Sequence, residues 1–387
     1  MINVLNHLRS LNSCTLVTTG RTGSDFFQSL LDSHPQVLTF NGNLNFHHFW
    51  KNSQCVKSGE FDLSDLIHEF IGKYIERFKS RYDYIERKDQ LGENYNQCLD
   101  IDLDKFGQCF IDIMDGNTVT SKHCLLSIYG AYAIAMGQNI DHKTLFFHHI
   151  HHHHGLQAFI KDFPDTKIIS MTRDPRANIV SGIYNHKKYK SESMNGAHQY
   201  FYINRILKDA NALKQYKNEF VSIKLESLGS NETLKKIAIW LEINYNEQLN
   251  KSTWGGLIWN GDRLSQNKRS GTGFSKEMLK NNWEDSMTIK DKYIFNFLMY
   301  NRLKHYDYFC KKNTFVSYLF IPILNIFPLS YEKENLSFNF IYKSFKKGDV
   351  RAIFINYYFY FKRVILFQKY YGRRINNEPF NLPYFGD

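Results

Sequence analysis

One stretch near the N-terminus, residues 15–31, constrains the fold of this chain more than any other. It reads TLVTTGRTGSDFFQSLL, an apolar run followed by a glycine-rich turn and then by apolar residues at helical spacing. This order predicts a strand, a tight turn and a helix. Such a turn directs backbone N–H groups and the positive end of the helix dipole at one point, which suits a phosphate or sulfate. An ordinary strand-to-helix turn would share these features, so other parts of the chain must support an anion site.

The charged residue inside this turn is Arg21. No G-x-x-x-x-G-K-[ST] pattern occurs in the turn, so a standard nucleoside triphosphatase loop is not supported. A kinase of that type would also need a magnesium-binding carboxylate after a strand, and none is evident.

Strands alternating with helices continue along the chain. Further strands are predicted at residues 36–40, 143–150, 167–173 and 220–225. Helical spacing dominates from about residue 60 to residue 140, a stretch long enough to form a helical insertion between strands. This alternation predicts an α/β fold with a parallel sheet and helices on both faces. In such sheets, ligands bind at the carboxyl ends of the strands.

Charge and cysteine content narrow the possible partners and the compartment. The chain holds 49 Lys and Arg against 38 Asp and Glu, and its net charge of +11 favours an anionic partner such as a nucleotide, an acidic glycan or a lipid surface. No recognised nucleic-acid-binding motif occurs, so we expect no nucleic-acid partner. The six cysteines form no C-x-x-C pair, and the N-terminus lacks the apolar core of a secretory signal. We therefore expect a cytoplasmic protein in a reducing compartment.

A second anion site is predicted at residues 167–186, which read KIISMTRDPRANIVSGIYNH. A buried strand delivers Arg173 at its carboxyl end, and the helix that follows places Ser181 eight residues later. The guanidinium fork and the serine hydroxyl could both reach one phosphate. A helix-capping turn with a surface arginine is the ordinary alternative. Two anion sites on neighbouring strand ends, however, suit a nucleotide with phosphates at both ends of its ribose.

The two motifs resemble those of the sulfotransferases that use 3′-phosphoadenosine 5′-phosphosulfate (PAPS). GRTGSDFFQSLLDSHP resembles their 5′-phosphosulfate loop in the form used by carbohydrate sulfotransferases, and TRDPRANIVSGIYNH resembles their 3′-phosphate motif. IKLESLGSNETLKKIAIWLEI is similar to a later strand-and-helix segment of the family, and NKRSGTGF to a basic glycine loop that closes over the nucleotide. The resemblance covers roughly residues 15–308, excluding the helical insertion and the C-terminal tail, and implies a P-loop-type fold.

The resemblance also implies which residues bind the donor. These are Gly20, Arg21, Thr22, Gly23, Ser24, Asp25, Phe26, Arg173, Ser181, Lys268, Arg269 and Gly271. Because a sulfuryl group carries dispersed negative charge through an in-line transfer, catalysis would consist mostly of positioning and cationic stabilisation. Arg21 would therefore be catalytic as well, by stabilising charge on the bridging oxygen. No metal is required, and the nucleotide product would be adenosine 3′,5′-bisphosphate.

The hydroxyl or amine that accepts the sulfuryl group needs a base. The segment FFHHIHHHHGL holds six histidines: His148, His149, His151, His152, His153 and His154. In the family's cytosolic branch the base is a histidine at the end of the strand before the 3′-phosphate strand, and its usual separation from the strand-end arginine points to His151. Strand alternation places His149 on the same side, so both are candidates. Adjacent histidines cannot direct every ring at one ion, so we expect no metal site.

Two histidines elsewhere are runner-up candidates for the base. His47 and His48 follow the second predicted strand, where some carbohydrate sulfotransferases keep their base as a glutamate. Substrate contact or a surface loop is the simpler interpretation of this pair.

The amino-acid composition changes in the C-terminal part. We therefore divide the chain into a sulfotransferase domain, residues 1–312, and an extension, residues 313–387. The extension begins with an apolar segment that is interrupted by prolines and short for a membrane span. Aromatic residues interleaved with Lys and Arg follow. This pattern indicates either an interfacial segment on an anionic membrane surface or a helical tail whose aromatic face packs on the main domain.

These observations together predict a PAPS-dependent sulfotransferase with a histidine general base. The acceptor would be a glycan or glycolipid, and the protein would be cytoplasmic, in part peripheral on the inner face of the membrane. The alternative from another class is a catalytically inactive nucleotide- or membrane-surface-binding protein with the same fold. Asp25, which puts a carboxylate beside the anion loop, is the feature that would favour this alternative.

Overall fold

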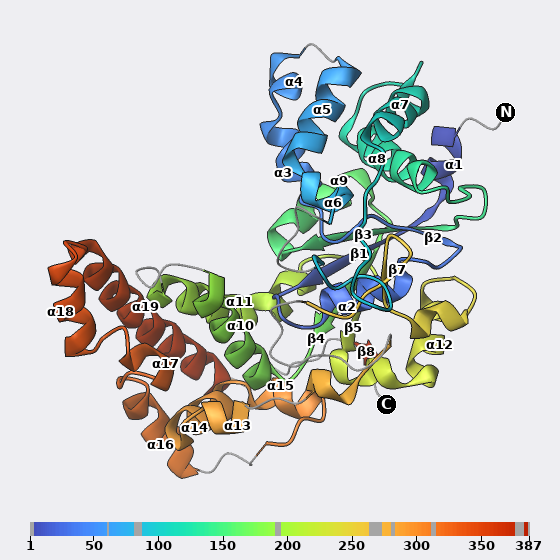
Figure 1. The fold of residues 1–387 in the computed structure, drawn as a ribbon. Coiled ribbons are helices and arrows are strands. Elements are labelled where there is room, and N and C mark those ends of the chain that lie inside the picture. The colour runs from blue at the N-terminus through green and yellow to red at the C-terminus, as the bar shows by residue number, and fades with distance from the viewer. Residues whose placement is uncertain are drawn as a thin grey trace.

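The computed structural model describes residues 4–59, 62–80, 87–189, 195–262, 273–279, 283–310, 315–375 and 383–385. A six-stranded sheet forms its centre (Figure 1), in the order β2-β3-β1-β4-β5-β8. The strands are β1 (Asn12–Thr18), β2 (Val37–Leu38), β3 (Leu145–His151), β4 (Lys167–Thr172), β5 (Phe220–Lys224) and β8 (Tyr384–Phe385). Every neighbouring pair is parallel. The predicted α/β fold with a parallel sheet is therefore confirmed.

The order of the strands determines which loops can meet. β1 lies between β3 and β4 and is buried from Cys14 to Thr18, as expected for a central strand covered on both faces. The carboxyl ends of β1, β3 and β4 are consequently adjacent at one edge of the sheet. The glycine turn follows β1, Arg173 follows β4, and the histidine segment spans the carboxyl end of β3, so the three converge there.

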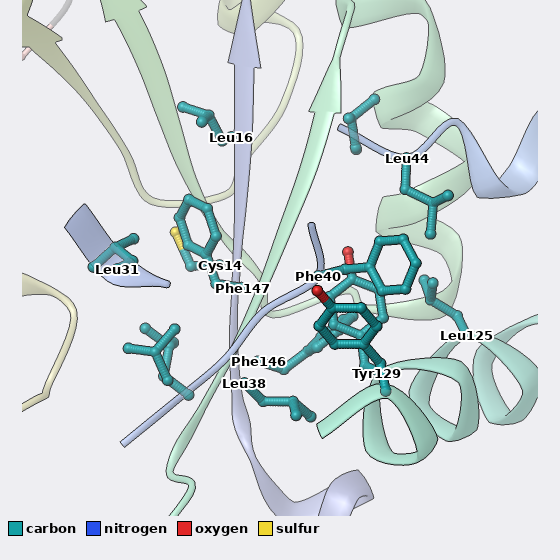
Figure 2. Packing of buried hydrophobic residues seen from close by; sticks show 14 of the residues in the cluster. Cys14, Leu16, Leu31, Leu38, Phe40, Leu44, Leu125, Tyr129, Phe146 and Phe147 are labelled. Atoms are coloured by element: carbon teal, nitrogen blue, oxygen red, sulfur yellow. The ribbon is translucent and has the colours of Figure 1, made fainter. Parts of the chain in front are cut away.

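The predicted helical insertion lies between β2 and β3. Its helices are α3 (Phe46–Asn52), α4 (Gln54–Ser58), α5 (Leu63–Lys73), α6 (Ile75–Phe78), α7 (Leu103–Met114) and α8 (Ser121–Ala135). An aromatic core joins them to the sheet, because Phe40 beyond β2 packs against Phe78 and Tyr132 with ring centroids 5.7 and 4.6 Å apart. Figure 2 shows Phe40 beside Tyr129 and Phe146 at this junction.

The remaining helices of the sheet domain precede, connect or follow its strands. They are α1 (Val4–Ser10), α2 (Ser24–Leu31), α9 (Leu156–Asp162), α10 (Pro175–Tyr189), α11 (Asn195–Lys214) and α12 (Asn231–Trp240). A small antiparallel pair, β6 (Thr253–Trp254) and β7 (Leu257–Ile258), and the short 3-10 helices η1 (His153–Gly155), η3 (Leu225–Gly229), η4 (Glu247–Asn250) and η5 (Lys276–Leu279) complete it.

A second group of helices, residues 283–375, forms what we call the C-terminal lobe. It contains α13 (Trp283–Ser286), α14 (Ile289–Leu298), α15 (Tyr300–His305), α16 (Phe315–Leu324), α17 (Ser330–Lys333), α18 (Phe338–Lys346) and α19 (Val350–Ile375). The lobe has its own apolar core, in which Phe295 and Phe367 pack with Ile203 of α11. In Figure 1 its helices extend away from the sheet beside α10 and α11. Among the described residues, no helix is both long and apolar enough to cross a bilayer.

Candidate active site

The glycine turn after β1 folds as a compact cradle at the start of α2. Gly20, Arg21 and Gly23 all have positive φ, of 89°, 55° and 83°. Gly23 also has no room for a side chain, because an added Cβ would lie 2.5 Å from Leu225 Cδ1. The first helical hydrogen bond runs from the Phe27 N–H to the Gly23 carbonyl at 2.9 Å, which leaves the preceding N–H groups of the first turn directed out of the helix. This is the geometry of a backbone anion site.

Side chains from β1 and from two later helices hold this cradle. The Thr18 hydroxyl accepts from the Gly20 N–H at 3.0 Å and also bonds the Thr22 hydroxyl. Asn178 of α10 donates to the Thr19 hydroxyl at 3.2 Å, and the Tyr202 hydroxyl of α11 donates to the Gly20 carbonyl at 2.9 Å. The loop is therefore fixed before any ligand arrives.

Tyr202 reaches the cradle across α10 at a glycine. A Cβ added to Gly182 would lie 2.2 Å from the Tyr202 ring, so this close approach of the two helices needs Gly182. Asn178 and Tyr202 also bond each other, and the two helices thus support the loop as one unit.

Arg21, Arg173 and Ser181 come together at this cradle. The Arg21 guanidinium donates from Nε to the Ser181 hydroxyl at 3.4 Å, and Arg173 donates from Nη1 to the Arg21 carbonyl at 3.2 Å. Arg173 is buried, and burial lowers the pKa of its guanidinium while Glu226 raises it. An arginine remains protonated at neutral pH even so. Two cations and a hydroxyl from β1, β4 and α10 therefore face one small region.

The turn that carries Arg173 is itself well anchored. Asp174 pairs with Arg176 at 2.7 Å, and Arg176 also donates to the Phe309 carbonyl at 2.8 Å. Glu226 accepts from the Asp174 N–H at 3.2 Å and from the Tyr308 hydroxyl at 2.8 Å. Arg176 is thus a structural residue that ties the turn to the segment after α15 in the C-terminal lobe.

The histidine segment brings one pair of imidazoles to the cradle. The register of β1 with β3 shifts between His149 and His151, and His151 adopts a positive φ of 73°. His151 Nε2 consequently lies near Gly20, 3.8 Å from the position of an added Cβ. His149 lies behind His151, with its Nε2 3.3 Å from His151 Nδ1. Non-glycine residues held at positive φ cluster at functional sites.

A glutamine sets the protonation pattern of this pair. Gln28 Nε2 donates to the Phe40 carbonyl at 2.7 Å and also reaches Thr39 and Gly42, so Gln28 Oε1 is the atom that faces His149 Nδ1, at 2.8 Å. His149 must therefore donate from Nδ1 and accept at Nε2. It follows that His151 donates from Nδ1 and carries its lone pair on Nε2, the atom beside the cradle. We call Gln28, His149 and His151 the histidine relay.

The other histidines of the segment and the runner-up pair have different surroundings. His148 points to the opposite face of β3, where it bonds the Tyr129 hydroxyl at 2.7 Å and stacks on Phe159. His152 lies 3.4 Å from Arg205, and burial lowers its pKa to about 3. His47 is held by Asp162 at 3.0 Å, on α9. His48 contacts Asn52 on the exposed side of α3.

Asp25 stands between the cradle and the relay, with Oδ1 buried and 3.9 Å from His149 Nδ1. Burial raises the pKa of this carboxyl, and the neighbouring guanidinium groups of Arg87, Arg77 and Arg21 oppose that rise. His149 is fully buried, and this burial lowers its pKa well below the ordinary value. His149 is consequently neutral at physiological pH.

One predicted donor-binding side chain does not face the cradle. The side chain of Phe26 is buried and packs against Phe274, with ring centroids 6.2 Å apart, so only its backbone N–H can serve the cradle. Lys268, Arg269 and Gly271 lie outside the described residues.

Sequence reasoning missed four residues that shape the site: Gln28, Asn178, Tyr202 and Asp262. Asp262 pairs with Arg21 at 3.3 Å. The only signal in the sequence was positional, since Gln28 lies in the helix after the glycine turn and Asn178 lies between Arg173 and Ser181. Nothing in the sequence indicated Tyr202 or Asp262. Within the described part of the chain, no group of three or more metal-ligating side chains occurs.

A parallel sheet whose central strand ends in this cradle, with a second cation from the neighbouring strand, defines a P-loop-type α/β protein with the geometry of an anion site at the sheet edge. Comparison with known families gives the particular family. Residues 15–247, more than half of the chain, match the model of the sulfotransferase family. The protein belongs to the sulfotransferase family.

Two solved structures are also similar to this chain. The chain is similar to the sulfotransferase domain from the Synechococcus PCC 7002 olefin synthase, with 16% identity, a TM-score of 0.36, and coverage of 72% of this chain and 90% of that chain. It is also similar to the sulfotransferase domain from the curacin biosynthetic pathway, with 12% identity, a TM-score of 0.34, and coverage of 62% and 77%. No curated protein matches the sequence.

Proposed function

We propose that this protein transfers a sulfuryl group from PAPS to a hydroxyl or amine of a glycan or glycolipid. The observation that carries the proposal is the hydrogen bond from Arg173 to the Arg21 carbonyl. It joins the two predicted anion sites into one, with Ser181 beside them. A nucleotide bearing phosphate or phosphosulfate groups at both ends of its ribose fits this arrangement, because each end meets its own cation.

The fit extends to the backbone cradle, which is formed without a ligand. The N–H groups at the start of α2 would hold the 5′-phosphosulfate, while Arg173 and Ser181 would hold the 3′-phosphate. When bound, PAPS supplies the activated sulfuryl group. Arg21 and the hydroxyls of Thr22 and Ser24 would stabilise charge on the bridging oxygen as the sulfur–oxygen bond breaks.

The histidine relay supports a base on the acceptor side of the cradle. His151 Nε2 would take the proton from the attacking hydroxyl, since its lone pair faces the loop. His149 and Gln28 are positioning residues, because they hold His151 in the tautomer with the proton on Nδ1. Because His149 is neutral, its Nε2 can accept the His151 Nδ1 proton, and this favours the tautomer over a pair in which both imidazoles are protonated.

A glycan or glycolipid acceptor rests on the form of the glycine turn, which resembles that of the carbohydrate sulfotransferases. The net charge of +11 also suits an acidic glycan or an anionic lipid headgroup.

Two measurements on the whole protein test the proposal. Adenosine 3′,5′-bisphosphate should raise the melting temperature of the protein, whereas adenosine 5′-monophosphate, which lacks the 3′-phosphate, should raise it less. Sulfur-labelled PAPS should then deliver label to an extracted glycan or glycolipid fraction. Bisphosphate binding with no transfer to either fraction would favour the inactive nucleotide-binding protein, for which Asp25 beside the cradle is the structural argument. Absence of binding would overturn both.

A further inference from the structure

The C-terminal lobe presents rows of large apolar side chains to solvent. On α19, Val350, Phe354, Tyr358, Phe361 and Ile365 are all exposed and recur every three or four residues, so they lie on one face of the helix. Phe354 is 71% exposed. On α18, Phe338, Tyr342 and Phe345 recur with the same spacing, and Phe338 is 80% exposed. We call these eight residues the apolar face.

The opposite side of α19 fixes how this face is presented. Asn356 accepts from the Gly196 N–H of α11 at 2.7 Å. Arg363 is fully buried and pairs with Glu332 of α17 at 2.7 Å. Leu366 and Phe367 belong to the core of the lobe. Because polar anchors and core contacts both hold the inner side, the outer row cannot rotate inward to bury itself.

Apolar exposure continues on a neighbouring helix of the lobe. α16 has no charged residue, and Leu319, Phe320 and Ile323 are each more than half exposed. Ile326 and Phe327, in the turn after it, are exposed to the same degree. Exposed apolar side chains gathered on neighbouring helices mark a site that contacts another apolar phase or protein.

Positive charge borders the apolar face. Lys343, Lys346, Lys347 and Arg351 are exposed at the turn between α18 and α19, next to Phe345 and Val350. From residue 335 to residue 375 the sequence holds nine Lys and Arg and a single acidic residue, Asp349. Aromatic and aliphatic side chains bordered by lysines are the composition of helices that lie in the interface of an anionic bilayer.

We propose that the apolar face docks the protein onto an anionic lipid bilayer, with α18 and α19 lying in the interface and the basic turn contacting the headgroups. Among the described helices none can span a bilayer, which agrees with surface attachment as the mode. A second copy of the chain fits less well, because self-association would oppose one basic turn to another with a single acid nearby to compensate. The inference goes beyond the proposed activity, which needs no membrane.

Vesicle co-sedimentation tests the proposal without donor or acceptor, so it can fail while sulfuryl transfer stands. The wild-type protein should bind vesicles that contain phosphatidylserine more strongly than vesicles of phosphatidylcholine alone. The double variant Phe354→Ser, Phe361→Ser should bind the former roughly tenfold more weakly or worse. Lys346→Gln with Lys347→Gln should cost about fivefold per lysine on the anionic vesicles alone.

A matched control distinguishes an effect specific to the apolar face from the effect of removing any exposed apolar side chain. Ile239 is 76% exposed on α12, remote from the lobe, and Ile239→Ser should bind vesicles as the wild type does. The stabilisation by adenosine 3′,5′-bisphosphate should be equal in all variants, which verifies that they fold.

Two outcomes would overturn the inference. One is a wild-type protein that does not sediment with anionic vesicles. The other is a lipid-free dimer that the Phe354 and Phe361 substitutions convert to a monomer, with vesicle binding unaffected; the face would then be an interface between copies of the chain.

Discussion

Arg21 and Arg173 meet at one carbonyl but have different surroundings. Arg173 is almost fully buried, and its guanidinium extends from the end of β4. Arg21 is partly exposed, donates a hydrogen bond to Ser181 and pairs with Asp262. A buried, charge-assisted contact contributes mainly to ground-state binding. A cation at the breaking bond contributes mainly in the transition state. The two arginines should therefore separate in a kinetic experiment.

We expect Arg173→Ala to weaken binding of adenosine 3′,5′-bisphosphate by about a hundredfold, in line with loss of a charge-assisted pair of about 3 kcal/mol. Arg21→Ala should instead lower kcat by about a hundredfold or more with a small change in bisphosphate affinity. Isothermal titration and initial-rate kinetics on both variants make the comparison. Normal turnover in Arg21→Ala would remove its proposed role in catalysis.

Gln28 has no direct contact with the cradle and acts through two histidines. His151→Ala should lower kcat by about 10²- to 10⁴-fold, as expected for loss of a general base. Gln28→Leu removes the acceptor of His149 Nδ1, so it should lower kcat by about tenfold with KM nearly unchanged. Nitrogen chemical shifts of the histidine rings should show His151 protonated on Nδ1 in the wild type and a mixture of tautomers in Gln28→Leu.

A purely structural Gln28 would give a different result in that experiment. The melting temperature of Gln28→Leu would fall, but the tautomer of His151 would not change. The decrease in kcat would be no larger than the loss of folded protein explains. The nitrogen spectrum therefore decides between a positioning residue and a packing residue.

Strand β3 contains two buried histidines, His148 and His149. Burial lowers the pKa of both His148 and His149 well below 6.5, and both are neutral in the folded protein. In the unfolded chain they take up protons near pH 6.5. Between the lowered pKa of the folded protein and the pKa near 6.5 of the unfolded chain, the unfolded state binds more protons. The stability that these groups contribute is therefore fully present above pH 6.5 and is lost as the pH falls below it.

The melting temperature should therefore drop steeply as the pH falls from about 6.5 to about 5, by an amount that corresponds to about 1.4 kcal/mol per pH unit for each buried imidazole. His148→Gln should flatten this slope, although it lowers the melting temperature at pH 7 by disturbing the bond to Tyr129. His142→Gln, at an exposed position, should leave the slope unchanged. Equal slopes in the three proteins would refute the assignment of acid sensitivity to β3.

Periodicity and turn chemistry predicted five of the six strands, since each carries a run of buried residues next to a glycine, proline or polar turn. β8 was missed because its two residues, Tyr384 and Phe385, follow a polar stretch and become a strand only by pairing with β5. Local sequence holds no information on such a partner.

The candidate site also has parts that the sequence predicted and parts that it did not. The cradle and the Arg173 turn have local signatures of glycine, charge and spacing, so both were recognised in the sequence. Tyr202 and Asp262 reach the cradle from residues 182 and 241 positions away, through helix packing at Gly182 and the pairing with Arg21. The exposure of the apolar face could not be read from the sequence either, because periodicity alone does not tell whether an apolar row faces a core or solvent.

At the scale of the whole molecule, the C-terminal lobe is attached to the sheet at two points. The chain enters the lobe at α13; Tyr308, which follows α15, bonds Glu226 beside β5, and the chain returns to β5 through β8. The lobe is thus held near β5 by Tyr308 and by the strand that follows it, and it is not a free appendage. A single protease cut at the exposed turn between α18 and α19 would leave two fragments that still travel together in gel filtration, held by β8 on one side and by the core of the lobe on the other.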